Sequence, residues 1–227
     1  MNEVIYEAIE AIRTMIVKNK QYLTDLDSPI GDSDHGINMA RGFDAVMLKL
    51  ENSNDPDIAS VLKKIGLALI SSVGGASGPL YGTAFLRAAV PAQGKTDFNA
   101  VLVKDMLSAA IQGIKDRGKA SQGEKTMIDA LEPAYEAFSS GCDNGGTLLE
   151  CFELASKAAL EGVEFTKKII ATKGRASYLG NRSIGHQDPG ATSSYLMLKA
   201  LTDFCSKKEG EANDGRNCNC IAQQESC

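Results

Sequence analysis

The sequence contains no tryptophan and only two histidines, and aromatic side chains make up 6% of its 227 residues. No window approaches the roughly 18 consecutive apolar residues that a transmembrane helix needs. The N-terminus also lacks the basic start and the apolar run of a signal peptide. Acidic residues outnumber basic ones, and the net charge of −5 gives no field that would attract nucleic acid or an anionic membrane. These absences predict a cytoplasmic protein that binds neither nucleic acid nor a membrane.

Familiar nucleotide-binding motifs are missing as well. No G-x-G-x-x-G segment occurs, so a Rossmann cofactor site has no support. Gly113–Ala120 matches most of a P-loop but ends in alanine, and it follows a helical pattern where a P-loop follows a strand. Gly180–Gly185 has the P-loop glycine spacing, but His186 stands where the lysine belongs. An EF-hand is excluded by spacing from Asp32 onward. If the protein binds a nucleotide, it does so through another kind of site.

Six cysteines divide into two sets. Three are scattered without the spacing of metal ligands and are expected to be small buried residues or incidental thiols. Three others lie in the polar C-terminal segment, where a C-x-C pair with a distant cysteine could bind a soft metal or form a disulfide, although no second pair completes a zinc site. The first set is Cys142, Cys151 and Cys205, and the second is Cys218, Cys220 and Cys227.

Apolar residues recur at helical spacing along most of the chain, and no alternating run between turn residues makes a convincing strand. The pattern predicts an all-α fold of about eight helices, with helix ends uncertain by a few residues. It stops after Phe204, so we expect one domain over residues 1–205 and a disordered tail over 206–227. The predicted helices cover Val4–Ile16, Ile37–Leu50, Ile58–Ile70, Leu80–Ala89, Val101–Ile114, Met127–Phe138, Leu148–Ile170 and Thr192–Phe204.

The connections between these helices are unusually rich in glycine. Four of five glycine clusters also carry carboxylate, hydroxyl, basic or imidazole groups. Glycine lets the backbone come close to a ligand and present its N–H groups. Each cluster alone would fit an ordinary helix cap, but together they indicate a site at one end of a helical bundle. The clusters are Gly31–Gly36, Gly74–Pro79, Gly118–Gly123, Gly141–Gly146 and Gly174–Gly190.

Three aspartates stand close together just before a predicted helix: Asp27, Asp32 and Asp34. Magnesium commonly binds a few carboxylates together with substrate phosphates. Asp32 and Asp34 would point the same way in an extended stretch, and the helix that follows would offer its N-terminal N–H groups to a phosphate. The alternative is that an aspartate simply caps this helix. One cap explains one aspartate, so the cluster predicts a metal–phosphate site.

Several other polar residues are candidates for the same site. His35 could donate to a phosphate, act as a general base, carry a phosphoryl group or be an ordinary hydrogen-bonding residue. Asn38 would lie on the same side of the helix start and could donate to a phosphate oxygen. Ser71–Leu80 suits a backbone nest around an anion, and the guanidinium of Arg175 could bind two phosphate oxygens. Asp188–Gly190 fits ordinary capping of the last helix.

These motifs together closely resemble the nucleotide-binding L subunits of dihydroxyacetone kinases. The resemblance covers roughly residues 1–205, with the motifs in the order of that family, and the long Arg175–Gly190 segment is highly specific. It implies an antiparallel eight-helix barrel with the nucleotide at one end. The segments that carry it are Gly31–Gly36, Val73–Leu80, Arg117–Ala120, Gly123–Met127 and Lys173–Gly190.

The resemblance also implies particular roles for residues. Two Mg²⁺ ions that bridge the phosphates would be bound by three aspartates: Asp27, Asp32 and Asp34. The residues expected to line the phosphates are His35, Gly36, Ile37, Asn38, Ala76 and Ser77. Gly118 and Met127 would bound the adenine and ribose, Arg175 would approach the nucleotide, and Asp188, Pro189 and Gly190 would close the pocket. Ser33 is a mild departure, because the family usually has a smaller residue there.

A separate L subunit resembles the branch of this family that depends on phosphoenolpyruvate. There ADP stays bound as a cofactor, is rephosphorylated by a phosphohistidine carrier (the M subunit), and passes its γ-phosphate to dihydroxyacetone held on a separate K subunit. The sequence leaves open an L-type kinase for another small sugar, and a nucleotide-dependent partner of a transcriptional regulator. A fatty-acid kinase is disfavoured, because His35 replaces the usual threonine.

Overall fold

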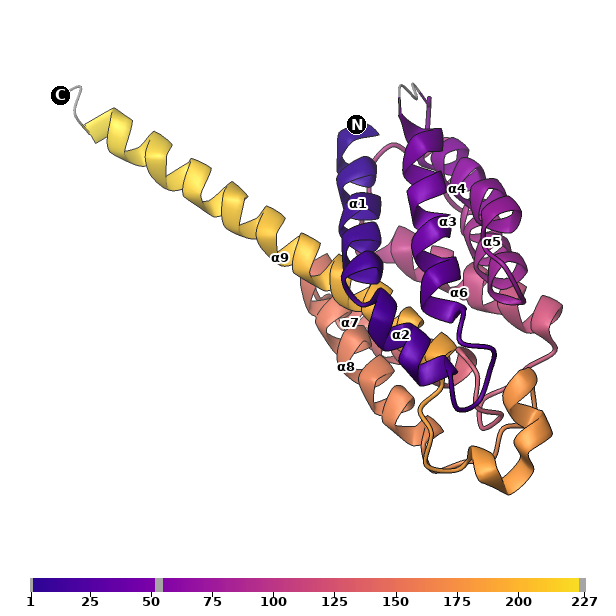
Figure 1. The fold of residues 1–227 in the computed structure, drawn as a ribbon. Helices are drawn as coiled ribbons and strands as arrows, with labels where there is room; N and C mark the ends of the chain where they lie inside the picture. The colour runs from indigo at the N-terminus through magenta and orange to yellow at the C-terminus, as the bar shows by residue number, and fades with distance from the viewer. Residues whose placement is uncertain (1, 52–54, 225–227) are drawn as a thin grey trace.

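The computed structural model describes residues 2–51 and 55–224, and within them it contains helices and no strand. The predicted all-α fold is confirmed. The α-helices are α1 (Asn2–Lys18), α2 (Lys20–Asp27), α3 (His35–Leu50), α4 (Ile58–Ser72), α5 (Ser77–Ala88), α6 (Ala100–Gly118), α7 (Ile128–Asp143), α8 (Leu148–Thr166) and α9 (Pro189–Gln224), with a 3-10 segment η1 (Arg175–Ser183) before the last (Figure 1).

Several helices begin where a side chain caps the first turn. Asp57 accepts from the Ser60 N–H at 2.9 Å at the start of α4, and Asn99 caps α6. A capping box between Thr147 and Glu150 opens α8. Such caps satisfy backbone N–H groups that have no partner inside the helix. They explain why these helices start at, or one residue before, the first residue of the apolar pattern.

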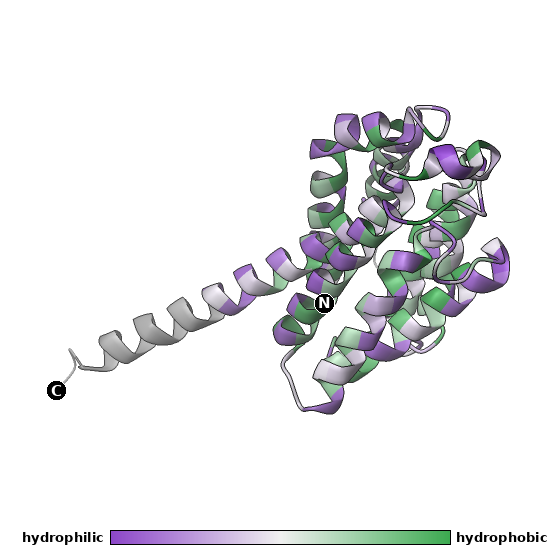
Figure 2. Cartoon of the chain, turned by 90° about the horizontal axis from the view of Figure 1, so that it is seen from below, coloured by the Kyte–Doolittle hydropathy of each residue, from purple (hydrophilic) through white to green (hydrophobic). Residues whose placement is uncertain are grey.

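The helices pack in a closed order. Each helix from α3 to α9 contacts the next one along the chain, and α9 returns to α1, which in turn contacts α3. The eight-helix barrel that the family resemblance implies stays a prediction. Buried apolar residues from α1, α3, α4, α5, α6, α7 and α9 form one large core cluster, and α7 and α8 contribute to a second beside it. Figure 2 shows hydrophobic and hydrophilic residues side by side along the helices of the bundle.

The short helix α2 is absent from the sequence-based prediction, and it contacts α3 and α9. Asn19 separates α2 from α1, and its side-chain amide donates to the Met15 carbonyl at 2.8 Å. Gly36 allows α3 to start against α2, because a Cβ there would lie 2.0 Å from the Lys20 carbonyl oxygen. Asp27 is therefore the last residue of a helix, where the sequence suggested a loop.

The last helix is longer than expected. The apolar pattern ends at Phe204, but α9 continues to Gln224 and projects away from the bundle (Figure 1). Lys208 binds Glu7 of α1 at 2.6 Å. The sequence predicts a disordered tail from residue 206, whereas the structure has helix here as far as Gln224. The domain boundary at residue 205 stays a prediction. Within the described part, no helix is long and apolar enough to cross a bilayer.

The cysteines do not form a site in the described part of the chain. Cys142, Cys151 and Cys205 are free thiols, and Cys151 is buried. Burial raises the pKa of the Cys205 thiol to about 11, which makes it unreactive at neutral pH. Cys227 and the side chains of Cys218 and Cys220 lie outside what the structure describes.

Candidate nucleotide and metal site

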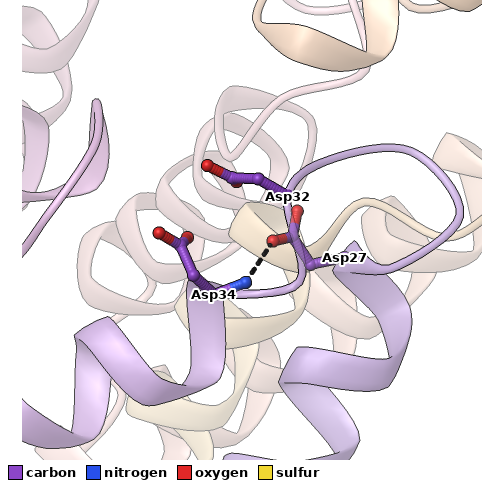
Figure 3. Close-up of side chains that lie close together, drawn as sticks. All are labelled: Asp27, Asp32 and Asp34. Carbon is purple, nitrogen blue, oxygen red and sulfur yellow. Dashed lines mark hydrogen bonds between the residues drawn. The ribbon is translucent and has the colours of Figure 1, made fainter.

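The three predicted aspartates converge at the junction of α2 and α3. One carboxylate oxygen from each of Asp27, Asp32 and Asp34 lies within 4.8 Å of the others (Figure 3). Asp27 is 7% exposed, and its Oδ2 accepts from the Asp34 N–H at 3.0 Å and the His35 N–H at 3.2 Å. Gly31 makes room for this carboxylate, since a Cβ there would lie 1.9 Å from Asp27 Oδ1. Asp27 thus fixes the loop that carries the other two aspartates.

The loop reaches this geometry by a turn. Ser33 has φ of 60°, so Asp32 and Asp34 do not lie in the extended stretch that the sequence suggested. Asp34 occupies the N-cap position of α3 but makes no side-chain capping bond. The capping alternative therefore leaves Asp32 and Asp34 unexplained, because the buried Asp27 accepts the N–H groups of this turn.

The electrostatics of the cluster favour a cation. Partial desolvation raises the pKa of Asp32, the charge of Asp34 raises it further, and Arg175 opposes both. The Arg175 guanidinium forms an ion pair with Asp32 Oδ2 at 2.7 Å. Three carboxylates this close repel one another unless a cation lies between them. An all-oxygen donor set of this kind fits a hard divalent ion such as Mg²⁺.

A pocket of about 430 Å³ opens beside the aspartates, between the start of α3, the loop before α5, the loop after α6 and the start of α9. It brings together almost all of the predicted site. The predicted residues that line it are Asp27, Asp32, Asp34, His35, Asn38, Ala76, Ser77, Gly118, Met127, Arg175, Asp188, Pro189 and Gly190. Gly36 is buried against α2 and Ile37 is 43% exposed, and neither lines the pocket. Their roles in binding stay predictions.

His35 and Asn38 are held in place by neighbouring side chains. The two ring nitrogens of His35 bind Ser77 Oγ at 3.2 Å and Ser193 Oγ at 2.9 Å. Burial lowers the pKa of His35, and the charges of Asp27 and Asp34 oppose that shift. Asn38 Oδ1 accepts from Arg41 at 2.7 Å, which leaves its amide N–H groups available to a ligand.

Lys125 is a pocket residue that sequence reasoning missed. It is 1% exposed and donates to the carbonyls of Thr166 and His186, both at 2.5 Å, and to that of Ile169 at 3.5 Å. Desolvation lowers its pKa, while Asp188 and Asp129 oppose the shift. The ammonium therefore joins three segments around the pocket: the loop before α7, the end of α8 and the turn before α9.

Asp188 closes the pocket at the start of α9. Its Oδ2 accepts from the Ala191 N–H at 2.7 Å, and its own N–H donates to Thr166 Oγ1 at 3.0 Å. Desolvation raises the pKa of this carboxyl to about 7, and Asp129 adds to the rise, whereas Ala191 and Lys125 oppose it. Because the pKa of this carboxyl is higher in the folded state than in the unfolded chain, binding of its proton favours the folded state.

The expected consequence is a pH-dependent stability. Between its ordinary pKa and about 7, folded Asp188 keeps a proton that the unfolded chain has lost, so its contribution to stability falls as pH rises through that window. Asp188→Asn keeps the cap on Ala191 without the charge. We expect the nucleotide-free variant to melt above the wild type at about pH 8 and close to it at about pH 4. Thermal melts at the two pH values test this, and an equal difference at both would contradict the titration of Asp188.

Comparison with known proteins agrees with this geometry. A family model described as the DAK2 domain matches residues 29–203. The ADP-binding subunit DhaL of a PEP-dependent dihydroxyacetone kinase from Escherichia coli is 46% identical, over 80% of this chain and 86% of that protein. The corresponding subunit of a PTS-dependent kinase from Lactococcus lactis is 45% identical, over 83% of this chain and 90% of the relative.

A solved structure shows the same fold in a longer protein. The dihydroxyacetone kinase of C. freundii in complex with AMP-PNP and Mg²⁺ has a TM-score of 0.70 and 25% identity, and the match covers 89% of this chain and 34% of that one. Together these comparisons confirm the family resemblance: the chain belongs to the DAK2-domain family. Within that family it groups with the DhaL subunits of PEP-dependent dihydroxyacetone kinases, which are phosphotransferases.

Proposed function

We propose that this chain is the subunit that binds ADP or ATP in a dihydroxyacetone kinase, with two Mg²⁺ ions held by Asp27, Asp32 and Asp34. The γ-phosphate would pass to dihydroxyacetone on a separate K subunit, and a phosphohistidine carrier, the M subunit, would rephosphorylate the bound ADP. The convergence of three carboxylates beside a pocket that contains hydroxyl, amide and guanidinium donors carries the proposal. The relatives support it, because the Escherichia coli relative is an ADP-binding subunit and the C. freundii kinase was solved in complex with AMP-PNP and Mg²⁺.

The donors around the pocket fit a polyphosphate. Ser77 begins α5, where unpaired backbone N–H groups favour an anion. Asn38 offers its amide N–H groups from the first turn of α3, and Ala76 precedes Ser77 in the glycine-rich loop. Arg175 is available from η1, since its guanidinium is exposed and its ion pair with Asp32 places it beside the carboxylates. These groups would hold the phosphates over the aspartates.

The opposite wall suits the nucleoside. Gly118 and Met127 lie on either side of the loop between α6 and α7, and Pro189 and Gly190 begin α9. Met127 is an adaptable apolar side chain that suits an adenine ring. Lys125 fixes the backbone of this loop to the turn before α9. The base would therefore meet a surface that exists before the nucleotide arrives.

Magnesium, when bound, would neutralise the negative charge of the β- and γ-phosphates, including the charge that develops during phosphoryl transfer. The residues of this chain hold and orient the donor phosphate, and we assign no nucleophile among them. His35 is not a free phosphate acceptor, because both of its ring nitrogens are hydrogen-bonded to serine hydroxyls. Catalysis in this chain would consist of positioning and charge stabilisation.

The nucleotide content of the purified protein tests the proposal. We expect protein prepared without added nucleotide to carry close to one ADP per chain, measured after acid release. With the K subunit and the phosphoenolpyruvate-driven carriers, this complex should phosphorylate dihydroxyacetone, and free ATP alone should not replace the carriers. Nucleotide-free protein that turns over with ATP alone would overturn the donor assignment. Activity with another small sugar and none with dihydroxyacetone would overturn the acceptor.

A further inference from the structure

A chain of hydrogen bonds runs from the pocket into the interior of the bundle. Ser77 Oγ lies 3.2 Å from His35 Nδ1, and His35 Nε2 lies 2.9 Å from Ser193 Oγ. Ser193 Oγ in turn lies 2.7 Å from the hydroxyl of Tyr81. His35 begins α3 and Ser77 begins α5. Tyr81 lies further along α5, and Ser193 lies near the start of α9. This series of hydrogen bonds therefore connects the three helices that surround the proposed phosphate site.

The inner end of this chain is closed to solvent. Ser193 is 0% exposed and Tyr81 is 3% exposed. The Tyr81 hydroxyl also lies 2.8 Å from Ser194 Oγ and 3.1 Å from the Gly190 carbonyl. Among the described side chains, no buried polar atom lacks a partner. A satisfied core network of this kind could serve packing alone, so the direction of its hydrogen bonds decides whether it serves the pocket.

The number of available protons leaves two possible donor-to-acceptor directions for this series of hydrogen bonds. A neutral imidazole carries one N–H, and each hydroxyl carries one O–H. In one direction Tyr81 donates to Ser193, Ser193 donates to His35 Nε2, and His35 Nδ1–H donates to Ser77. The Ser77 hydroxyl is then free to donate into the pocket. In the other direction Ser77 donates to His35 Nδ1, His35 Nε2–H donates to Ser193, and Ser193 donates to the Gly190 carbonyl 3.1 Å away. Ser77 then presents only a lone pair to the pocket, which repels an anionic oxygen.

We propose that Ser193 and Tyr81 are positioning residues for the nucleotide phosphates. They hold His35 as the Nδ1–H tautomer, so that the Ser77 hydroxyl donates to a phosphate oxygen. Ser193 does not line the pocket. Tyr81 lines it, but its hydroxyl is hydrogen-bonded to Ser193, Ser194 and the Gly190 carbonyl. The inference rests on the proposed nucleotide site, and it adds two residues from the interior to it. Bonds that all point the same way also strengthen one another.

The neighbouring serine provides a matched control. Ser194 is as buried as Ser193, at 1% exposure, and its Oγ also lies close to the Tyr81 hydroxyl. Both hydroxyls donate to the Gly190 carbonyl, Ser193 at 3.1 Å and Ser194 at 2.8 Å, but of the two serines only Ser193 is hydrogen-bonded to His35. Ser193→Ala and Ser194→Ala thus remove the same group from the same helix, but only the first interrupts the path to Ser77.

The tautomer of His35 can be read directly by long-range ¹H–¹⁵N NMR of the side chains. The chain has only two histidines, so a His186→Gln variant assigns the signals. In the ADP–Mg²⁺ complex we expect the Nδ1–H form of His35 in the wild type and in Ser194→Ala. In Ser193→Ala we expect a mixture of tautomers and a roughly tenfold weaker affinity for ADP, because a hydrogen bond to the charged phosphate is weakened. Ser194→Ala should bind ADP as the wild type does.

Three outcomes would overturn the inference. One is an Nε2–H or doubly protonated His35 in the wild-type complex. The second is an equal loss of ADP affinity in Ser193→Ala and Ser194→Ala, which would indicate a packing role for both serines. The third is wild-type protein that does not bind ADP at all, and this result alone would also overturn the proposed function. Equal melting temperatures of the two variants would show that they are folded to the same extent.

Discussion

Asp32→Asn is expected to abolish most magnesium-supported ADP binding while leaving the helices intact. Loss of an outer-sphere partner already costs a metal site roughly 10–100-fold, so loss of a proposed ligand should cost on the order of 100-fold or more in ADP affinity. The fold should tolerate the change, because the Asp32 carboxylate is partly exposed and its ion pair with Arg175 lies at the surface. Calorimetric titration of ADP with and without Mg²⁺ measures the loss, and circular dichroism measures the helix content.

Asp25→Asn is the matched control for this variant. Asp25 is an exposed carboxylate of α2 that accepts from the Gln21 amide at 2.8 Å and lies outside the pocket. Its loss changes the net charge by the same amount and should leave ADP affinity unchanged. If Asp32→Asn binds ADP as the wild type does, the metal assignment is wrong. If it loses helix content instead, the aspartate serves the fold.

Lys125→Met is expected to reduce the free energy of unfolding by about 2–4 kcal/mol. The buried ammonium donates to the carbonyls of Thr166, Ile169 and His186, and methionine fills a similar volume without any donor. Three carbonyls would lose a partner, and Asp129 and Asp188 would lose a nearby cation. Urea unfolding of the nucleotide-free protein, followed by circular dichroism, measures the difference.

Lys119→Met controls for loss of a lysine in the same connection. Lys119 is exposed, and like Lys125 it has a positive φ, of 51° against 60°. The two variants therefore share the backbone strain and the charge change but differ in burial. We expect Lys119→Met to unfold at nearly the urea concentration of the wild type. Equal destabilisation by both variants would mean that the three carbonyl contacts of Lys125 contribute nothing.

The sequence predicted the long helices because each buries one apolar stripe. The pattern in Ile37–Leu50 and Ile58–Ile70 matches α3 and α4 closely, since buried residues recur every three to four positions. The helix α2 was missed because it has only eight residues, of which two are buried, and a single residue separates it from α1. The 3-10 segment η1 was missed because it has only nine residues, is interrupted at Gly180 and buries only Ala176 and Ser183.

The site was predictable where its residues are close together in the sequence. Asp32, Asp34 and Asn38 stand within seven residues of one another and could be recognised as one cluster. Lys125 and Ser193 could not be found in this way, because their roles depend on burial and on partners more than 40 residues away. A lysine in a polar, glycine-rich loop is ordinarily exposed, and only the packing of α8 and α9 around it makes it structural.

The position of the metal relative to the nucleotide tests the account most directly. Crystals grown with ADP and Mn²⁺ in place of Mg²⁺ would show the ions by anomalous scattering. We predict peaks within roughly 2.0–2.4 Å of carboxylate oxygens of Asp27, Asp32 and Asp34, shared with the phosphates of ADP. Nucleotide bound in the pocket with no ion at these carboxylates, or an ion held there while ADP lies elsewhere, would contradict it.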